Sequence, residues 1–220
     1  MASVIDFPAG SRHIVAGAVS AFVGVSEWVD NGVKMRRADR RVILVGPDGT
    51  GKTQMANVIS RDISSRINVK APIFHHDYAT GLAWFKSMNV KSGYAKTMEG
   101  DLAHSWVVYD RHPAIDFPVY DVALRGGSLV KPYLSDPYDT TLYYKWFRLP
   151  VVRKALEDAI IILLQDQKVE PSADRGDPEG IKDALGSLRE QYDRAIFSLC
   201  QYDRSLIWSS NTVIFRETIN

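Results

Sequence analysis

The 220 residues contain a single cysteine, Cys200, so the chain cannot form an intramolecular disulfide. This scarcity fits a reducing compartment, and we expect a cytoplasmic protein. An excess of either charge is also missing, because the formal net charge is only +1 at pH 7. The protein therefore has no global field that would draw it to nucleic acid or to an anionic membrane.

Long hydrophobic runs are equally scarce. Residues 14–25 have the length and the small side chains of a signal-peptide core, but this stretch is too short to span a bilayer. Only Arg12 and His13 precede it closely, and no clear cleavage site follows it. We interpret the stretch as a docked helix or a loosely held extension, with a secretory signal as the alternative, and we expect no membrane partner.

The sequence does contain an alternation of short apolar runs with amphipathic segments. The predicted strands lie at residues 42–45, 71–75, 106–109 and 160–164, with one or two further strands expected at 205–210 and 212–215. The predicted helices lie at about 52–66, 79–104, 139–158 and from 181 onward. Strands that alternate with helices favour an α/β domain with a mostly parallel central sheet and helices on both faces. We expect residues 39–220 to form this domain and residues 1–38 to be an N-terminal extension.

Residues 46–53, GPDGTGKT, match the P-loop pattern G-x-x-x-x-G-K-[ST] and stand between a predicted strand and a predicted helix. Glycines let backbone N–H groups approach phosphate oxygens, and the helix N-terminus adds a favourable dipole. We therefore expect a three-layer P-loop NTPase fold that binds ATP and Mg²⁺, with a chance glycine-rich turn as the alternative. The residues expected around the nucleotide are Gly46, Asp48, Gly49, Thr50, Gly51, Lys52, Thr53 and Gln54.

Within this loop, Lys52 is expected to reach the β- and γ-phosphates, and the Thr53 hydroxyl to ligate Mg²⁺. Two motifs of other P-loop classes are missing from the chain. It has no N-K-x-D stretch for guanine, and no obvious run of four apolar residues followed by D-E, as ATP-driven machines carry. The strand at residues 106–109 is followed instead by Asp110 and Arg111.

These features resemble the thymidylate kinase family. Residues 46–53 are similar to its G-x-D-G-x-G-K-T loop, residues 107–113 (VVYDRHP) to its D-R-Y strand end, and residues 174–196 to its lid and the helix that follows. The resemblance covers about residues 40–210, with the lid at about residues 166–180. It implies transfer of the ATP γ-phosphoryl group to a (deoxy)nucleoside monophosphate, and family members are commonly homodimers.

The resemblance also implies roles for single residues. Asp48 would turn toward the 3′-hydroxyl of the acceptor sugar, Asp110 would hold Mg²⁺ through water or contact the acceptor, and Arg111 would grip the acceptor phosphate. Family members that have a glycine at the position of Gly49 carry the cations that stabilise the transition state in the lid. The resemblance therefore makes Arg175 the candidate for that role. The structural alternatives are an ordinary strand-end ion pair for Asp110 and Arg111, and an exposed loop residue for Arg175.

The chain departs from the family at the second strand, where residues 74–81, FHHDYATG, replace an arginine-bearing R-E-P-G-G motif. His75 or His76 could substitute in part for that arginine when protonated. Adjacent strand residues point to opposite faces, so at most one of the two faces the site. We select His76, together with Asp77, as the expected acceptor contacts, with Tyr78 as the alternative to Asp77.

Aromatic residues are the remaining candidates for acceptor binding. Trp84 or Phe85 could stack on the base, although aromatics at helical spacing are more often core residues. Tyr120 lies near the place of a base-side tyrosine of the family. Residues 124–150 interleave aromatics with cations, as grooves for single-stranded nucleic acid do, with packing onto the sheet as the alternative. A kinase acting on a base or end within DNA and a non-catalytic ATP-binding protein are therefore the alternative functions.

Overall fold

The computed structural model describes residues 4–7, 40–68, 70–88, 106–133, 142–156, 159–166, 185–206 and 213–219. Within them, six strands form one sheet of parallel neighbours in the order β1-β6-β5-β2-β4-β3. The strands are β1 (Val4–Phe7), β2 (Arg40–Val45), β3 (Ile73–His75), β4 (Trp106–Asp110), β5 (Ala159–Asp166) and β6 (Val213–Ile219). The prediction of an α/β domain with a parallel sheet is confirmed.

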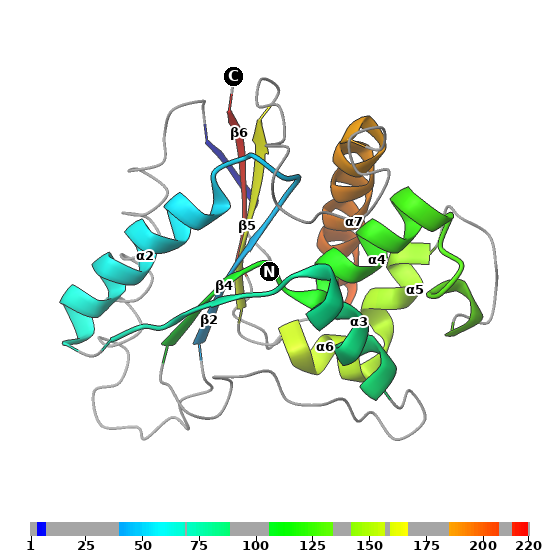
Figure 1. Ribbon diagram of the computed structural model, residues 1–220, viewed down its shortest axis with the longest axis horizontal. Coiled ribbons are helices and arrows are strands. Elements are labelled where there is room, and N and C mark those ends of the chain that lie inside the picture. Colours follow the sequence, from blue (N-terminus) through cyan, green and yellow to red (C-terminus); the bar gives the residue numbers. More distant parts are fainter. Residues whose placement is uncertain are drawn as a thin grey trace.

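Helices cover both faces of this sheet. They are α2 (Lys52–Ile67), α3 (Tyr78–Ser87), α4 (Pro113–Arg125), α5 (Leu142–Arg148), α6 (Pro150–Leu156) and α7 (Leu185–Leu206), with a 3-10 turn η1 at Lys131–Tyr133. Among the described elements, α2 packs on one face, and α3 to α7 gather on the other (Figure 1). The predicted layers of helix, sheet and helix are therefore present, and one side of the sheet carries most of the helices.

Each central strand contributes side chains to both layers. All five residues of β4 are buried. Trp106 and Val108 join the apolar cluster beneath α2, whereas Val107 and Tyr109 join the larger cluster on the opposite face. A strand that is covered on both faces reads as a continuous apolar run rather than as an alternating one. This is why the four-residue runs in the sequence predict these strands correctly.

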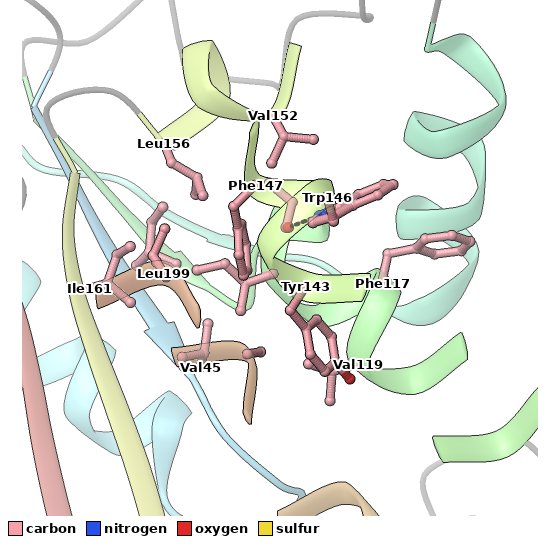
Figure 2. Packing of buried hydrophobic residues seen from close by; sticks show 14 of the residues in the cluster. Val45, Phe117, Val119, Tyr143, Trp146, Phe147, Val152, Leu156, Ile161 and Leu199 are labelled. Carbon is pink, nitrogen blue, oxygen red and sulfur yellow. Dashed lines mark hydrogen bonds between the residues drawn. The ribbon is translucent and has the colours of Figure 1, made fainter. Parts of the chain in front are cut away.

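The larger cluster contains three aromatic residues of α5, Tyr143, Trp146 and Phe147. Figure 2 shows them among side chains of the sheet and of α7. Trp146 and Phe147 are fully buried and Tyr143 nearly so. The indole Nε1 of Trp146 donates a hydrogen bond to the carbonyl oxygen of Ala114, at 2.7 Å. These three aromatic residues pack in the core, as the structural alternative predicts, and do not line an open groove.

Helix α4 is an element that the sequence analysis does not predict. Every residue from Pro113 to Asp121 is buried, and Pro118 lies inside the helix. The segment therefore lacks a polar face and an amphipathic period, and it carries a residue that normally argues against a helix. His112 caps the helix, because its Nδ1 accepts a hydrogen bond from the backbone N–H of Ala114 at 3.2 Å. Tertiary burial rather than local preference specifies this helix.

The N-terminal residues Val4–Phe7 pair in parallel with β6 at the edge of the sheet. Part of the segment that we assigned to an N-terminal extension thus adds an edge strand. Several predicted segments lie outside the described residues: most of that extension, residues 89–104 of the second predicted helix, residues 167–180 of the lid and residues 181–184 of the last predicted helix. Of the possible strand at 205–210, residues 205–206 are instead the end of α7, and the rest is not described. Across the described part of the chain, no helix is both long and apolar enough to cross a membrane.

The buried phenol of Tyr143 makes the stability of this fold depend on pH in the alkaline range. The Tyr143 hydroxyl donates a hydrogen bond to Oε1 of Gln191 on α7, at 2.9 Å, and burial raises its pKa well above the usual value. Above about pH 10 the unfolded chain releases this proton and the folded chain keeps it, so the free energy of unfolding should fall as pH rises. Tyr143→Phe should reduce that slope by up to about 1.4 kcal/mol per pH unit. Urea unfolding between about pH 9 and pH 11 measures it, and an unchanged slope would contradict this account.

Candidate functional site

The candidate site lies at the carboxyl edge of the sheet, where β2, β3 and β4 end side by side. Their register places Leu44 of β2 and His75 of β3 on either side of Asp110. In parallel sheets the carboxyl ends of the strands share one edge, and α/β proteins bind ligands there. The glycine-rich loop that follows β2 therefore opens beside Asp110.

This loop depends on glycines. Gly46, Gly49 and Gly51 have positive φ angles of 140°, 81° and 83°, which side chains rarely allow. A Cβ on Gly46 would also lie 2.0 Å from the carbonyl oxygen of Leu164 on β5. Gly51 begins α2 without a side-chain cap, and the first turn of α2 has no acidic residue. No carboxylate of the first turn therefore accepts hydrogen bonds from the N–H groups at the start of α2, and these groups favour an anionic ligand.

Lys52 is folded back over the loop. Its Nζ donates a hydrogen bond to the carbonyl oxygen of Pro47 at 2.5 Å and lies 3.4 Å from Oγ1 of Thr50. The residue is 5% exposed, so the ammonium group is held against the loop. A phosphate oxygen would be a stronger acceptor for this cation than a neutral carbonyl oxygen, because its negative charge adds a direct Coulomb attraction.

Thr53 and Asp110 meet between the first turn of α2 and the end of β4. The Thr53 hydroxyl donates a hydrogen bond to Oδ2 of Asp110 at 2.6 Å. Asp110 is 1% exposed, and among the described residues its other oxygen, Oδ1, has no hydrogen-bond partner. A hydroxyl that donates its proton to a carboxylate still has lone pairs for another ligand. The structure thus brings together the two residues that we predicted for Mg²⁺.

The donor atoms of this pair suit Mg²⁺. That ion prefers oxygen ligands and is usually bound by one or two carboxylates together with substrate phosphates and water. A buried carboxylate oxygen without a partner is costly, and a cation would satisfy it. The part of the chain that the structure describes has no group of three or more His, Cys, Asp or Glu side chains that could hold a metal by itself.

Of the two adjacent histidines, His75 faces Asp110 and His76 does not. The Nδ1 atom of His75 lies 3.1 Å from Oδ2 of Asp110, and its side chain is 61% exposed. His76 is buried on the opposite face, with its ring stacked on Tyr109 at 5.5 Å between centroids. The two histidines thus take opposite faces, as alternation along a strand predicts, and contact of His76 with the acceptor stays a prediction.

Asp48, Arg111 and Tyr120 form a second cluster on the other side of the end of β4. The Arg111 guanidinium makes an ion pair with the Asp48 carboxylate through Nη2 and donates from Nη1 to the Tyr120 hydroxyl at 2.5 Å. The Tyr120 hydroxyl donates in turn to Oδ2 of Asp48, at 2.7 Å. These residues come from the loop, the strand end and α4, and all three are among those expected on the acceptor side.

The backbone of Arg111 has a φ of 77°, which is unusual for a residue other than glycine. Such a conformation costs about 1–3 kcal/mol, and a hydrogen bond from its N–H to the carbonyl oxygen of Leu44, at 3.0 Å, helps to hold it. The turn sends the guanidinium toward α4. Desolvation would lower the pKa of this group, but neighbours that include Tyr120 and Asp116 raise it overall. The site therefore contains a permanent cation.

Asp116 connects α4 to α7 next to this cluster. Its Oδ1 accepts a hydrogen bond from the Tyr192 hydroxyl at 2.5 Å, and its Oδ2 accepts one from the backbone N–H of His112 at 2.7 Å. Burial raises the pKa of the Asp116 carboxyl. The rings of Tyr120 and Tyr192 also meet edge to face, with centroids 6.5 Å apart. Helix α7, which follows the predicted lid, is thereby joined to the helix that carries Tyr120.

Three other predicted contacts have a capping or a core role in the structure. Asp77 caps α3, because its Oδ1 accepts hydrogen bonds from the N–H and the hydroxyl of Thr80, both at 2.7 Å, and these bonds lower its pKa. Trp84 and Phe85 are 3% and 5% exposed, and Phe85 stacks on Phe117 at 4.5 Å between ring centroids. The placement of these two aromatics agrees with the core alternative and not with stacking on a base.

Gln54 is exposed in the first turn of α2. Arg175 lies outside the described residues, so its role in a lid stays a prediction.

No family model matches the chain, and no curated protein matches its sequence. Among solved structures, the chain is similar to one from the complex of HORMA, CdnC and Trip13 of E. coli MS115-1. The identity is 12% and the TM-score 0.24, over 96% of this chain and 56% of that chain. A TM-score at this level carries no argument about fold or function.

Gly46→Ala should damage both the fold and the site. The added Cβ would collide with the backbone of Leu164, so we expect the free energy of unfolding to fall by at least about 2 kcal/mol and nucleotide binding to be lost. The control is Gly186→Ala, because a Cβ there meets nothing within 4 Å. This substitution should leave nucleotide binding unchanged, and because alanine favours a helix more than glycine does, it should not lower the free energy of unfolding. Urea unfolding and nucleotide titration measure the effects. Equal behaviour of the two variants would contradict the close packing of this loop on β5.

Proposed function

We propose that the protein is a P-loop kinase that transfers the γ-phosphoryl group of ATP to a (deoxy)nucleoside monophosphate. The observation that supports this most directly is the hydrogen bond between Thr53 and Asp110, at the mouth of the glycine-rich loop. A second cluster, which contains the Arg111 guanidinium, stands across the same strand end. Phosphoryl transfer requires two anionic substrates to be aligned and their charge to be neutralised, and it needs little covalent chemistry from the protein.

The donor side of the proposed site is the loop of residues 46–53. Its backbone N–H groups and the N-terminus of α2 would bind the triphosphate of ATP. Lys52 would exchange the carbonyl oxygen of Pro47 for a phosphate oxygen. Thr53 and Asp110 would hold Mg²⁺, which when bound supplies positive charge to the phosphate oxygens. The hydrogen bond between Thr53 and Asp110 supports the assignment of the cation to this pair.

The acceptor side is the cluster of Asp48, Arg111 and Tyr120. The planar guanidinium of Arg111 can bind a phosphate through two parallel hydrogen bonds. In the absence of an acceptor, the Asp48 carboxylate and the Tyr120 hydroxyl hold that fork in place. An arriving phosphate would share or replace these partners, and Asp48 would then be free to accept a hydrogen bond from a sugar hydroxyl. By the family resemblance, Arg175 of the lid would add positive charge during transfer.

The structure weakens the support for a nucleic-acid acceptor. That alternative depended on the aromatic residues of the segment 124–150, and Tyr143, Trp146 and Phe147 are buried in the core. Tyr144 is partly buried, and its ring lies 5.2 Å from the guanidinium carbon of Arg148, one turn away on α5. We therefore favour a free nucleotide as the acceptor.

An ADP-release assay over all nucleoside monophosphates and one oligonucleotide tests this proposal. We expect turnover with at least one free monophosphate. Lys52→Ala should lower kcat by about 100-fold or more, because it removes a preorganised cation from the transferring group. The control is Lys70→Ala, which changes an exposed lysine before β3 and should retain activity. No turnover of any monophosphate would refute the proposal, and ATP binding without turnover would indicate a non-catalytic protein.

Arg111→Lys tests the acceptor side separately. Lysine keeps the charge but lacks the planar fork, so the KM for the monophosphate should rise by about 10-fold or more, while the KM for ATP changes by less than about 2-fold. Steady-state kinetics with each substrate varied in turn measures this split. A parallel rise in both KM values would show that Arg111 does not act on the acceptor selectively.

A further inference from the structure

His75 contacts Asp110 but has no part in the transfer proposed above. It is the last residue of β3, the edge strand beside β4, and its register partner is Asp110 itself. The backbone N–H of the next residue, His76, donates to the carbonyl oxygen of Asp110 at 3.1 Å. Strand pairing therefore fixes the Cα of His75 next to that of Asp110, and the two side chains leave the sheet on the same face.

Two hydrogen-bonding groups converge on one oxygen of the Asp110 carboxylate. The Thr53 hydroxyl lies 2.6 Å and the His75 Nδ1 atom 3.1 Å from Oδ2. Because a carboxylate oxygen accepts hydrogen bonds, Nδ1 carries the proton when this contact is a hydrogen bond. Oδ1 is buried and has no hydrogen-bond partner among the described residues. The two oxygens of this carboxylate thus have different surroundings.

Two donors hold the carboxylate better than one. The terminal torsion of an aspartate side chain is broad, so a single hydrogen bond from Thr53 would still permit the group to rock about its Cβ–Cγ bond. A second donor on the same oxygen, arriving from the neighbouring strand, restricts that rotation. It also keeps Oδ2 engaged and leaves Oδ1 available for a ligand. The groups that hold a metal-binding side chain in this way commonly change metal affinity by 10- to 100-fold when they are removed.

We propose that His75 is a positioning residue, which orients the Asp110 carboxylate and thereby raises the affinity of the Thr53–Asp110 pair for a divalent cation. This inference rests on the proposed function, because it assumes that the pair binds the cation that accompanies ATP. It does not require the imidazole to touch the cation or either substrate. A direct contact between His75 and the acceptor phosphate is the competing role, and the experiment separates the two.

The experiment compares two substitutions at this exposed position. His75→Asn retains an N–H donor close to the place of Nδ1, whereas His75→Leu removes the donor. The measured quantity is the Mg²⁺ concentration that gives half of the thermal stabilisation produced by a non-hydrolysable ATP analogue. We expect His75→Leu to raise this concentration by about 10-fold and His75→Asn to stay within about 3-fold of the wild type. The melting temperatures without ligand verify that all variants are folded.

A double-mutant cycle shows whether His75 acts through Asp110. In the Asp110→Asn background, His75→Leu should have no further effect on the cation requirement, because the group that it orients has lost its charge. An equal effect in both backgrounds would overturn the inference. An unchanged cation requirement in His75→Leu would also overturn the inference. If the KM for the monophosphate rises in that variant while the cation requirement stays the same, His75 serves the acceptor directly.

The binding measurement is independent of turnover, so the two proposals fail in different ways. If the wild type shows cation-dependent stabilisation but phosphorylates no monophosphate, the kinase proposal fails, and the comparison of the His75 variants still decides the inference. If the wild type turns over a monophosphate and His75→Leu has the wild-type cation requirement, the kinase proposal stands and the inference fails. If the wild type shows no cation-dependent stabilisation, the inference is overturned.

Discussion

The hydrogen bond between the Thr53 hydroxyl and the Asp110 carboxylate joins α2 to the end of β4, through two residues that are 57 positions apart in the chain. It requires the loop of residues 46–51 to turn sharply at the end of β2, so that α2 begins directly over the neighbouring strand. Gly46 permits that turn, because its α-carbon lies too close to β5 for any side chain. The parallel pairing of β2 with β4 then places Asp110 beside Leu44, near the end of β2 where the loop begins. A close backbone approach and a strand register together create the site.

The strand end of β4 divides the candidate site into two sides. Asp110 continues the alternation of the strand and faces α2, where it meets Thr53 and His75. Arg111 breaks that alternation with its positive φ and turns toward Asp48 and α4. Asp110 and Arg111, which are adjacent and opposite in charge, therefore belong to different clusters. The backbone strain at Arg111 is offset by its hydrogen bonds and by the buried contacts of α4 and α7.

Much of the fold could be predicted because the central strands are buried on both faces and read as apolar runs. Helix α4 could not, since it is buried from Pro113 to Asp121 and contains Pro118, so that no period distinguishes it. Edge strand β1 was equally hidden, because four residues near the terminus carry no pattern of their own. The aromatics Trp84, Phe85 and Trp146 illustrate a related limit. Their spacing fits a ligand surface as well as a core, and only the packing of the helices placed them in the core.

By itself the sequence determined the glycine-rich loop, its lysine and threonine, and the charged pair that ends β4, because these depend on residue types at short spacing. Tertiary structure decided which side chains share a face and which strands are neighbours. It turned His75 toward Asp110 and His76 toward Tyr109, and it joined Asp48, Arg111 and Tyr120 into one cluster. The physical reason is that register and crossover direction arise from the packing of the whole sheet, which no local segment contains.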